Sequence, residues 1–447
     1  MTIQEFQLKL FSAAESTGFS DVEMYYEKKE VFSCKVYKGE IDQYEIAEDG
    51  GVSFRGIING KMGYAYSEKI DDASIPFLLD NAKENTQIMH DEHNEEIFSG
   101  SSHYEQGNFF SRSLNEVTIP EKIQFIKDVE RELLAQDPRI VASEYCGVRT
   151  ETVSRNLLNN KGLSLTDQMN FLYVIVEAIV KDGEETKTSF EFEVTKDFQR
   201  LNPKEIAKNA ADEALSQLGS RNIPSKEYSV LLRNDAAANL LATYSTNFSA
   251  ENTQAGLSLL KDKLGKQIAV QRITIVDDPF LEDGLASRTF DSEGVATKKL
   301  TLVESGVLQS LLHNQKTAKK EQTETTGHGH KDSYKSVVKV GPSNLYLEPS
   351  TIPFEALLAL MDEGILITNL QGLHSGANTV SGDFSLAANG FYVKDGKVQY
   401  PVNQMTIAGN FYQLLQNVEE IGADLTFPLS PVGSPSVLVK SLAVTVE

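Results

Sequence analysis

The sequence has no tryptophan and only two cysteines, Cys34 and Cys146. Cysteines so far apart exclude a disulfide framework and a cysteine-rich metal cluster, and their apolar settings favour buried, inert thiols. Long apolar runs are missing as well. The longest, residues 171–180, contains Glu177 and is too short to cross a bilayer. The sequence therefore predicts no membrane-spanning segment.

Positive charge is also scarce. The 447 residues include 42 lysines and arginines against 64 aspartates and glutamates, which gives a formal net charge of −22. Direct nucleic-acid binding is not expected, because neutralising phosphates requires clustered basic side chains. The first residues lack the basic stretch and apolar core of a signal peptide, so we expect a cytoplasmic protein.

Hydrophobic periodicity predicts an α+β fold in two domains, which suits a chain of this length. The N-terminal domain, residues 1–220, is predicted to open with a helix and a capping box from Thr2 to Glu5. An antiparallel meander with flanking helices follows, divided into short strands by turn signals such as Asp49-Gly50-Gly51 and Asn59-Gly60. The C-terminal domain, residues 227–447, is predicted to be mostly β. Further helices are expected at residues 73–89, from Pro120 onward, and at residues 203–218 and 353–363.

One stretch is the natural place for chemistry. Residues 228–233 look like a buried strand, and the following helix is expected to begin at Asn234 or Asp235 and to extend to Phe248. On a helix of this kind a zinc peptidase places two histidines and a glutamate. Those residue types are missing here, which argues against a zinc site on this helix.

Histidines elsewhere in the chain could bind a metal instead. His328 and His330, with Asp332 nearby, could chelate a metal or contact a peptide, and the alternative is a polar loop. A divalent metal could also be bound by His90, His93 and His103. The alternative is that these histidines form a solvated surface cluster.

Two pairs of carboxylates precede turn residues. They are Asp277 with Asp278, and Asp291 with Glu293. Such pairs could hold a cation or act as acid and base. We favour a structural role, because aspartates commonly close turns by accepting backbone N–H bonds.

A series of short segments in the second half resembles the TldD/PmbA family, and specifically its PmbA-like (TldE) branch. Each segment is weak alone, but together and in this order they are specific. The segments are Val276-Asp-Asp-Pro279, Phe290-Asp-Ser-Glu-Gly294, Glu304-Ser-Gly-Val-Leu308, Thr325-Thr-Gly-His328, Pro342-Ser-Asn-Leu-Tyr346, Ser381-Gly-Asp-Phe384, Asn389-Gly-Phe391 and Ala408-Gly-Asn410. The resemblance extends more loosely over the first half.

The resemblance implies a cytosolic peptidase system. TldD-like chains of the family bind a metal through a His-Glu-x-x-x-His motif, whereas PmbA-like chains lack the motif and pair with them. In this sequence the motif positions are occupied by Ala242, Thr243 and Asn247. The family's C-terminal cysteine ligand is also missing from residues 425–431. We therefore expect no catalytic residue and no metal in this chain, and zinc or a similar divalent metal only in a TldD-like partner.

The leading hypothesis is a PmbA-like subunit of a metallopeptidase complex that processes or degrades peptides and is not catalytic alone. His328, His330, Asn344 and Tyr346 are its candidate contacts to the peptide. The family is also associated with modulation of DNA gyrase through peptide substrates. The alternative is a stand-alone homodimeric scaffold that binds peptides, and a third possibility is a peptidase with an unrecognised histidine metal site.

Overall fold

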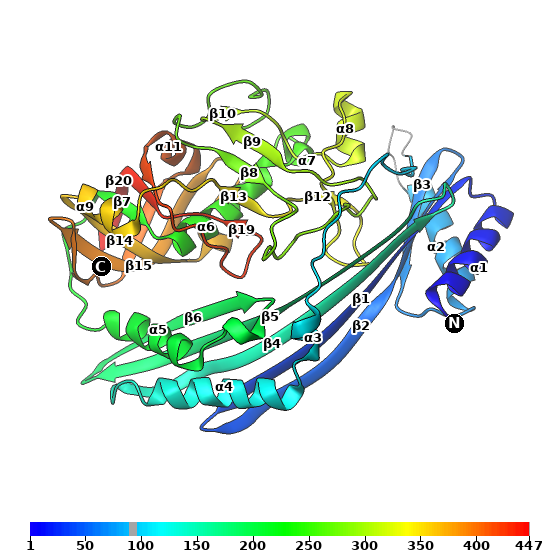
Figure 1. Ribbon diagram of the computed structural model, residues 1–447. Helices are drawn as coiled ribbons and strands as arrows, with labels where there is room; N and C mark the ends of the chain where they lie inside the picture. Colours follow the sequence, from blue (N-terminus) through cyan, green and yellow to red (C-terminus); the bar gives the residue numbers. More distant parts are fainter. Residues whose placement is uncertain (89–95, 447) are drawn as a thin grey trace.

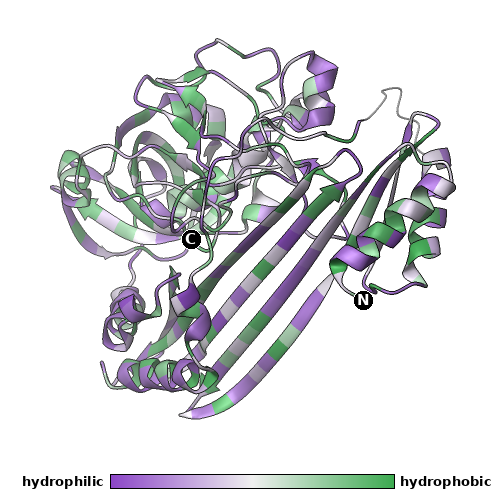
Figure 2. Cartoon of the chain, turned by 45° about the vertical axis from the view of Figure 1, so that its right-hand side comes forward, coloured by the Kyte–Doolittle hydropathy of each residue, from purple (hydrophilic) through white to green (hydrophobic). Residues whose placement is uncertain are grey.

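A long, curved antiparallel sheet forms most of the first half of the chain (Figure 1). The computed structural model describes residues 1–88 and 96–446. The strand order is β3-β2-β1-β4-β5-β6, and along the strands hydrophilic and hydrophobic residues alternate (Figure 2). This alternation is typical of a sheet whose two faces differ in burial. The strands are β1 (Asp21–Tyr37), β2 (Glu40–Ile58), β3 (Lys61–Ser67), β4 (Ile140–Asn159), β5 (Ser164–Asp182) and β6 (Glu185–Thr195).

Helices cover this sheet at both ends. At one end α1 (Ile3–Ser16) and α2 (Ser74–Ile88) pack on β1 to β3 through a cluster that includes Phe6 and Phe54. At the other end α4 (Ile119–Leu134) and α5 (Pro203–Ser216) pack on the sheet through another cluster. The capping box predicted from Thr2 to Glu5 is confirmed. Along the chain, the short α3 (Arg112–Glu116) precedes α4, and the 3-10 turn η1 (Phe198–Arg200) precedes α5.

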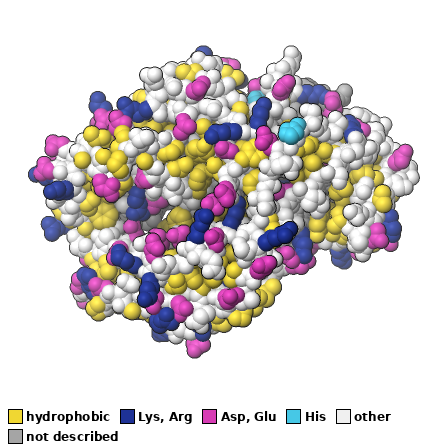
Figure 3. All heavy atoms as spheres, in the orientation of Figure 1, with side chains coloured by type: hydrophobic (Ala, Val, Ile, Leu, Met, Phe, Trp, Pro, Cys, Tyr) yellow, Lys and Arg dark blue, Asp and Glu magenta, His cyan; other side chains and the backbone are white. Residues whose placement is uncertain are grey.

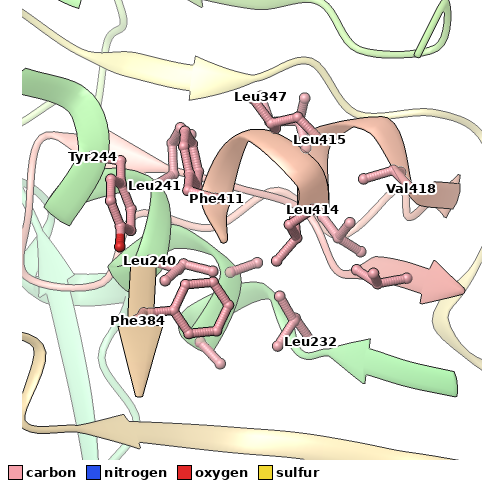
Figure 4. Packing of buried hydrophobic residues seen from close by; sticks show 14 of the residues in the cluster. Leu232, Leu240, Leu241, Tyr244, Leu347, Phe384, Phe411, Leu414, Leu415 and Val418 are labelled. Carbon is pink, nitrogen blue, oxygen red and sulfur yellow. The ribbon is translucent and has the colours of Figure 1, made fainter. Parts of the chain in front are cut away.

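The second half contains a closed β-barrel, because the pairings β14-β7-β20-β17-β15 return to β14. Two helices, α6 (Asn234–Tyr244) and α11 (Phe411–Gln416), close the hydrophobic core of this half, where Tyr244 stacks on Phe411 at 4.4 Å between ring centroids (Figure 4). The strands of this sheet are β7 (Lys226–Leu232), β14 (Glu363–Gln371), β15 (Asp383–Lys394), β16 (Lys397–Pro401), β17 (Met405–Asn410), β18 (Val418–Ile421) and β20 (Val437–Val446).

A second, smaller sheet has the order β10-β9-β8-β13-β19, and β11 pairs with β12 beside it. Its strands are short because long loops separate them. They are β8 (Ile275–Asp277), β9 (Leu300–Glu304), β10 (Val307–Leu308), β13 (Leu345–Leu347) and β19 (Val432–Gly433). The two-stranded sheet consists of β11 (Gly329–His330) and β12 (Lys339–Val340). The remaining elements are η2 (Ser245–Phe248), α7 (Ala250–Gln254), α8 (Gln315–Glu321), α9 (Phe354–Leu360) and α10 (Leu373–Gly376).

The α+β class is confirmed, but the predicted turn at Asp49-Gly50-Gly51 is wrong. These residues lie inside β2, where Gly50 pairs with Lys28 and Gly51 with Glu27. A Cβ on Gly51 would collide with the ring of Tyr334, so this glycine marks a close approach of another segment. Residues 140–159 form one continuous strand, β4.

The helix predicted to reach Phe248 ends earlier, at Tyr244, and continues as the 3-10 turn η2. Its N-cap is Arg233 rather than Asn234 or Asp235. The Ser245 hydroxyl donates to the Ala242 carbonyl at 2.8 Å, and such local bonds compete with the regular helical ladder.

The predicted hairpin-type turn at Asn59-Gly60 is confirmed, since β2 and β3 pair across it. The predicted boundary between domains, near residues 220–227, stays a prediction. No helix within residues 1–88 and 96–446 is long and apolar enough to cross a membrane.

Candidate functional site

The positions that correspond to the metal motif lie at the end of α6 and in η2. Ala242 packs partly buried against the core of the second half. The Thr243 hydroxyl donates to the Asn239 carbonyl of its own helix at 2.9 Å. Asn247 is only 1% exposed, and neither polar atom of its side chain has a hydrogen-bond partner among the described residues.

These side chains do not fit a zinc ion. Ala242 has no ligand atom, and Thr243 has no carboxylate that could act as a general base. Asn247 offers only a neutral amide, and it lies in the 3-10 turn that follows α6. Among the described residues no group of three or more His, Cys, Asp and Glu side chains is placed to hold a metal ion.

His328 belongs to a buried polar group around Asp277, the last residue of β8. Its Nε2 lies 3.0 Å from Asp277 Oδ1, and its Nδ1 lies 2.8 Å from the Thr326 hydroxyl. The backbone N–H of Ser343 donates to Asp277 Oδ2 at 2.8 Å, and the Ser343 hydroxyl donates to Oδ1. Burial acts to raise the pKa of Asp277, but His328 and Ser343 outweigh it and hold that pKa below its usual value.

This group has the residue types of a serine hydrolase but not the arrangement. Both Ser343 and His328 bind the same carboxylate, so no histidine nitrogen is bonded to the serine hydroxyl. A nucleophilic serine requires such a base. The arrangement therefore does not activate Ser343 as a nucleophile. The Thr326 hydroxyl beside His328 Nδ1 also lies 3.1 Å from the His313 carbonyl, to which it can donate.

His330 lies closer to the surface, with 39% of its side chain exposed. Its Nδ1 is 3.4 Å from the Arg288 guanidinium, and its Nε2 is 3.4 Å from Asp332. Partial burial and Arg288 lower the pKa of His330 to about 4, although Asp332 acts in the opposite direction. His330 is therefore neutral near pH 7 and can donate or accept a hydrogen bond.

The other two candidate contacts are buried. The Asn344 side chain donates to the Asp278 carbonyl at 2.8 Å and to Ser287 at 2.9 Å, and it accepts from the Ala286 N–H at 3.0 Å. Tyr346 is 6% exposed and its hydroxyl accepts from Lys299 at 3.3 Å. Of the candidates, His330 is the one whose side chain is most accessible to a peptide, and contact by all of them stays a prediction.

Two of the paired carboxylates, Asp278 and Asp291, close turns as predicted. The other two bind distant segments instead, since Asp277 contacts His328 and Glu293 contacts Arg55. Asp278 Oδ1 accepts from the Phe280 N–H at 3.0 Å. Asp291 Oδ1 accepts from the N–H groups of Glu293 and Val295 at 2.8 and 3.0 Å, and its Oδ2 accepts from the Gly329 N–H at 2.7 Å. Burial and the neighbouring Glu293 nevertheless raise the pKa of Asp291 to about 7.

A buried set of charges joins the two halves of the chain. We call Glu23, Arg55, Glu293 and Lys331 the junction cluster. Arg55 Nε donates to Glu23 Oε1 at 2.8 Å, and its Nη1 lies 3.4 Å from Glu293 Oε1. All four residues are less than a tenth exposed. Burying charges is costly unless they are paired, so the junction cluster favours one specific docking of the halves.

Lys331 is the member of the junction cluster whose ammonium group contacts a hydroxyl and two aromatic rings. Its Nζ donates to the Ser53 hydroxyl at 2.6 Å and lies 4.7 and 5.0 Å from the ring centroids of Tyr25 and Tyr64. Burial and the nearby Arg55 lower the pKa of Lys331 to about 7. The segment that follows His330 is thus anchored in the first sheet.

Sequence analysis did not identify the junction cluster. Its members are distant in sequence, and each reads alone as an ordinary surface charge. The available signal was Arg55, which interrupts the apolar run of residues 52–58. Of the histidines considered at residues 90–103, His90 and His93 lie outside the described residues, and His103 is exposed.

Comparison with protein families gives matches along most of the chain. Residues 22–86 match the PmbA/TldA metallopeptidase domain 1, residues 112–218 match the central domain, and residues 225–446 match the C-terminal domain. The central match begins at α3 and ends just after α5, and the C-terminal match covers the barrel and the polar group around Asp277.

Individual proteins are similar over nearly their whole length. A metalloprotease PmbA homolog of Haemophilus influenzae is 26% identical over 91% of this chain and 88% of its own. The crystal structure of a Thermotoga maritima protein, described as a modulator of a DNA gyrase, has 34% identity and a TM-score of 0.92, covering 99% of this chain and 100% of that one. TldE from Thermococcus kodakarensis, at 22% identity and a TM-score of 0.90, covers 98% of this chain and 100% of its own and shares the fold.

Proposed function

Because the chain belongs to the PmbA/TldD family of metallopeptidases, we propose that it is a PmbA-like subunit that is not catalytic by itself. It pairs with a TldD-like chain, which supplies the metal and the general base. Its own task is to complete the enclosure around a peptide and to present backbone and polar groups to it.

The residues at positions 242, 243 and 247 carry this proposal. Hydrolysis at a zinc centre requires ligands for the ion and a base that accepts a proton from the bound water. Ala242, Thr243 and Asn247 supply neither, and the Thr243 hydroxyl is already engaged with its own helix. A chain that retains the family's fold without these groups is best explained as a supporting subunit.

The description of the Thermotoga maritima relative as a modulator of DNA gyrase suggests an indirect route to that enzyme. This chain has a net charge of −22, and on the face shown in Figure 3 basic and acidic side chains are interspersed. Such a surface does not attract a phosphate backbone. We propose that any effect on gyrase passes through the peptides that the complex processes.

Co-expression with the TldD-like chain of the same genome tests the pairing. With an affinity tag on either chain in turn, the untagged chain should co-purify at a ratio close to one to one. Each tagged chain alone and the tag on an unrelated protein are the controls. If this chain purifies as a homodimer under both arrangements and never with the TldD-like chain, the stand-alone scaffold is the better account.

A further inference from the structure

The loop that follows α7 differs in character from the rest of this acidic chain. Within residues 256–272 three leucines are about half exposed: Leu257 at 49%, Leu259 at 51% and Leu264 at 50%. Lysines lie between these leucines in the sequence, so the loop exposes both apolar and basic side chains. We call residues 256–272 the leucine-lysine loop.

The same loop is locally basic. Lys261, Lys263 and Lys266 are exposed, and none of them has a carboxylate of a described residue within 4.0 Å. The one acidic residue of the loop is Asp262, and Arg272 is already paired with Glu420 at 2.6 Å. A positive loop on a chain of net charge −22 therefore offers unpaired ammonium groups to an acidic partner.

A pocket of about 480 Å³ lies between this loop and α11. Figure 4 shows Phe411 and Leu414 of α11 pointing into the core, and the residues beside them on the helix face the pocket instead. Its volume falls within the range of ligand-binding pockets, about 300–1,000 Å³. The lining residues are Leu259, Leu260, Lys263, Gln267, Ile268, Tyr412, Gln413, Gln416 and Asn417.

The polar groups of the pocket suit a peptide. Gln413, Gln416 and Asn417 carry amides that can donate to and accept from a peptide backbone. The partly buried side chain of Tyr412 forms part of the pocket wall.

We propose that this pocket is a docking site for an acidic linear peptide segment that carries a bulky apolar side chain. The apolar side chain inserts between Leu259, Leu260 and Ile268, and carboxylates on either side of it meet Lys261 and Lys263. The inference goes beyond the proposed function and needs neither the metal nor the TldD-like chain. The positive charge of the loop beside a pocket large enough for an apolar side chain favours an acidic peptide as the occupant.

Fluorescence polarisation with labelled peptides tests the site on the full-length chain. The probe is fluorescein-labelled Glu-Asp-Leu-Phe-Glu-Asp. One control peptide replaces its four acidic residues by lysine, and another replaces Leu and Phe by serine. The acidic apolar probe should bind saturably and lose affinity as salt rises, whereas both control peptides should bind at least about fivefold more weakly.

Two variants locate the binding on the protein. Lys263→Glu reverses one charge at the rim, and Gln416→Trp fills the pocket from an exposed position on α11. Each should weaken binding of the probe about fivefold or more. Lys204→Glu is the matched control, because Lys204 is an exposed lysine on α5 in the other half of the chain, and its binding should equal that of the unaltered protein.

Binding that is absent, equal for all peptides or unchanged in both variants would overturn the proposal. It would also fail if vesicles containing phosphatidylglycerol bind the protein through Lys263 while the peptide does not. A third contrary result is self-association in light scattering that Gln416→Trp abolishes, since the occupant would then be a second copy. These results leave the proposed pairing untouched, because that pairing is measured by co-purification.

Discussion

Replacing Lys331 by methionine should change how the stability of the protein depends on pH. The side chain is 5% exposed and its pKa in the folded chain is about 7, because burial and Arg55 oppose its charge. In an unfolded chain a lysine has a pKa of about 10.4. Between these values the unfolded chain holds a proton that the folded chain has released.

Proton linkage gives the direction in which the free energy of unfolding changes with pH. Where the unfolded state binds more protons, the free energy of unfolding rises with pH. For Lys331 this rise starts near pH 7 and amounts to on the order of 1 kcal/mol for each pH unit until the unfolded lysine also titrates. Below pH 7 both states are protonated, and the cost of burying the charge is fully present. Methionine has a similar shape and no charge, so it removes this dependence.

Urea denaturation followed by circular dichroism at pH 6, 7, 8 and 9 measures the effect. The unfolding free energy of the unaltered chain minus that of Lys331→Met should be flat from pH 6 to 7. It should then rise by on the order of 2 kcal/mol up to pH 9. Because only the difference is used, groups that titrate equally in both proteins cancel.

Lys204→Met on α5 is the control for losing one positive charge. The absolute difference at any one pH also contains the lost bond to Ser53, which is on the order of 1 kcal/mol, so the slope is the decisive quantity. A difference that stays constant within about 0.5 kcal/mol from pH 6 to 9 would show that Lys331 keeps an ordinary lysine pKa in the folded chain.

Three further outcomes are expected. The purified, tag-free chain should hold no stoichiometric zinc after mild chelation. About one zinc per chain by elemental analysis would contradict this, and His328→Ala and His330→Ala would then be the next variants to examine. The combined substitutions Ala242→His, Thr243→Glu and Asn247→His should not create peptidase activity, since a third ligand and the groups that orient the histidines are missing; chelator-sensitive cleavage by this variant would refute that. Native mass spectrometry at micromolar concentration should show a dimer, either of this chain alone or with the TldD-like chain. We expect its interface to exceed about 2,000 Å² and to be built mainly from the second half. A monomer in both cases would count against this prediction.

Two local signals in the sequence predicted secondary structure correctly. The capping box from Thr2 to Glu5 and the Asn59-Gly60 turn depend on neighbouring residues, and the structure confirms both. The Asp-Gly-Gly signal at residues 49–51 failed because Gly51 is required by a distant contact. Tyr334 packs against Gly51, and a one-dimensional pattern does not contain that information.

The candidate site shows the same limit. The turn-closing role of Asp291 could be inferred from Gly294 three residues later, and the structure confirms it. The bond of His328 to Thr326, two residues away, is local. That His328 is bonded to Asp277 could not be inferred, since Asp277 lies 51 residues away in the sequence. The junction cluster escaped prediction for the same reason, because Arg55 and Glu293 meet only when the two halves dock.

The most direct test of the central claim is the rate at which an unstructured fluorogenic peptide is cleaved while this chain is titrated into a fixed amount of the TldD-like chain. We expect no cleavage by this chain alone. In the titration the rate should rise and level off at one to one, and it should vanish with a chelator. Chelator-sensitive cleavage by this chain alone, or a rate for the TldD-like chain that does not change on its addition, would contradict the account.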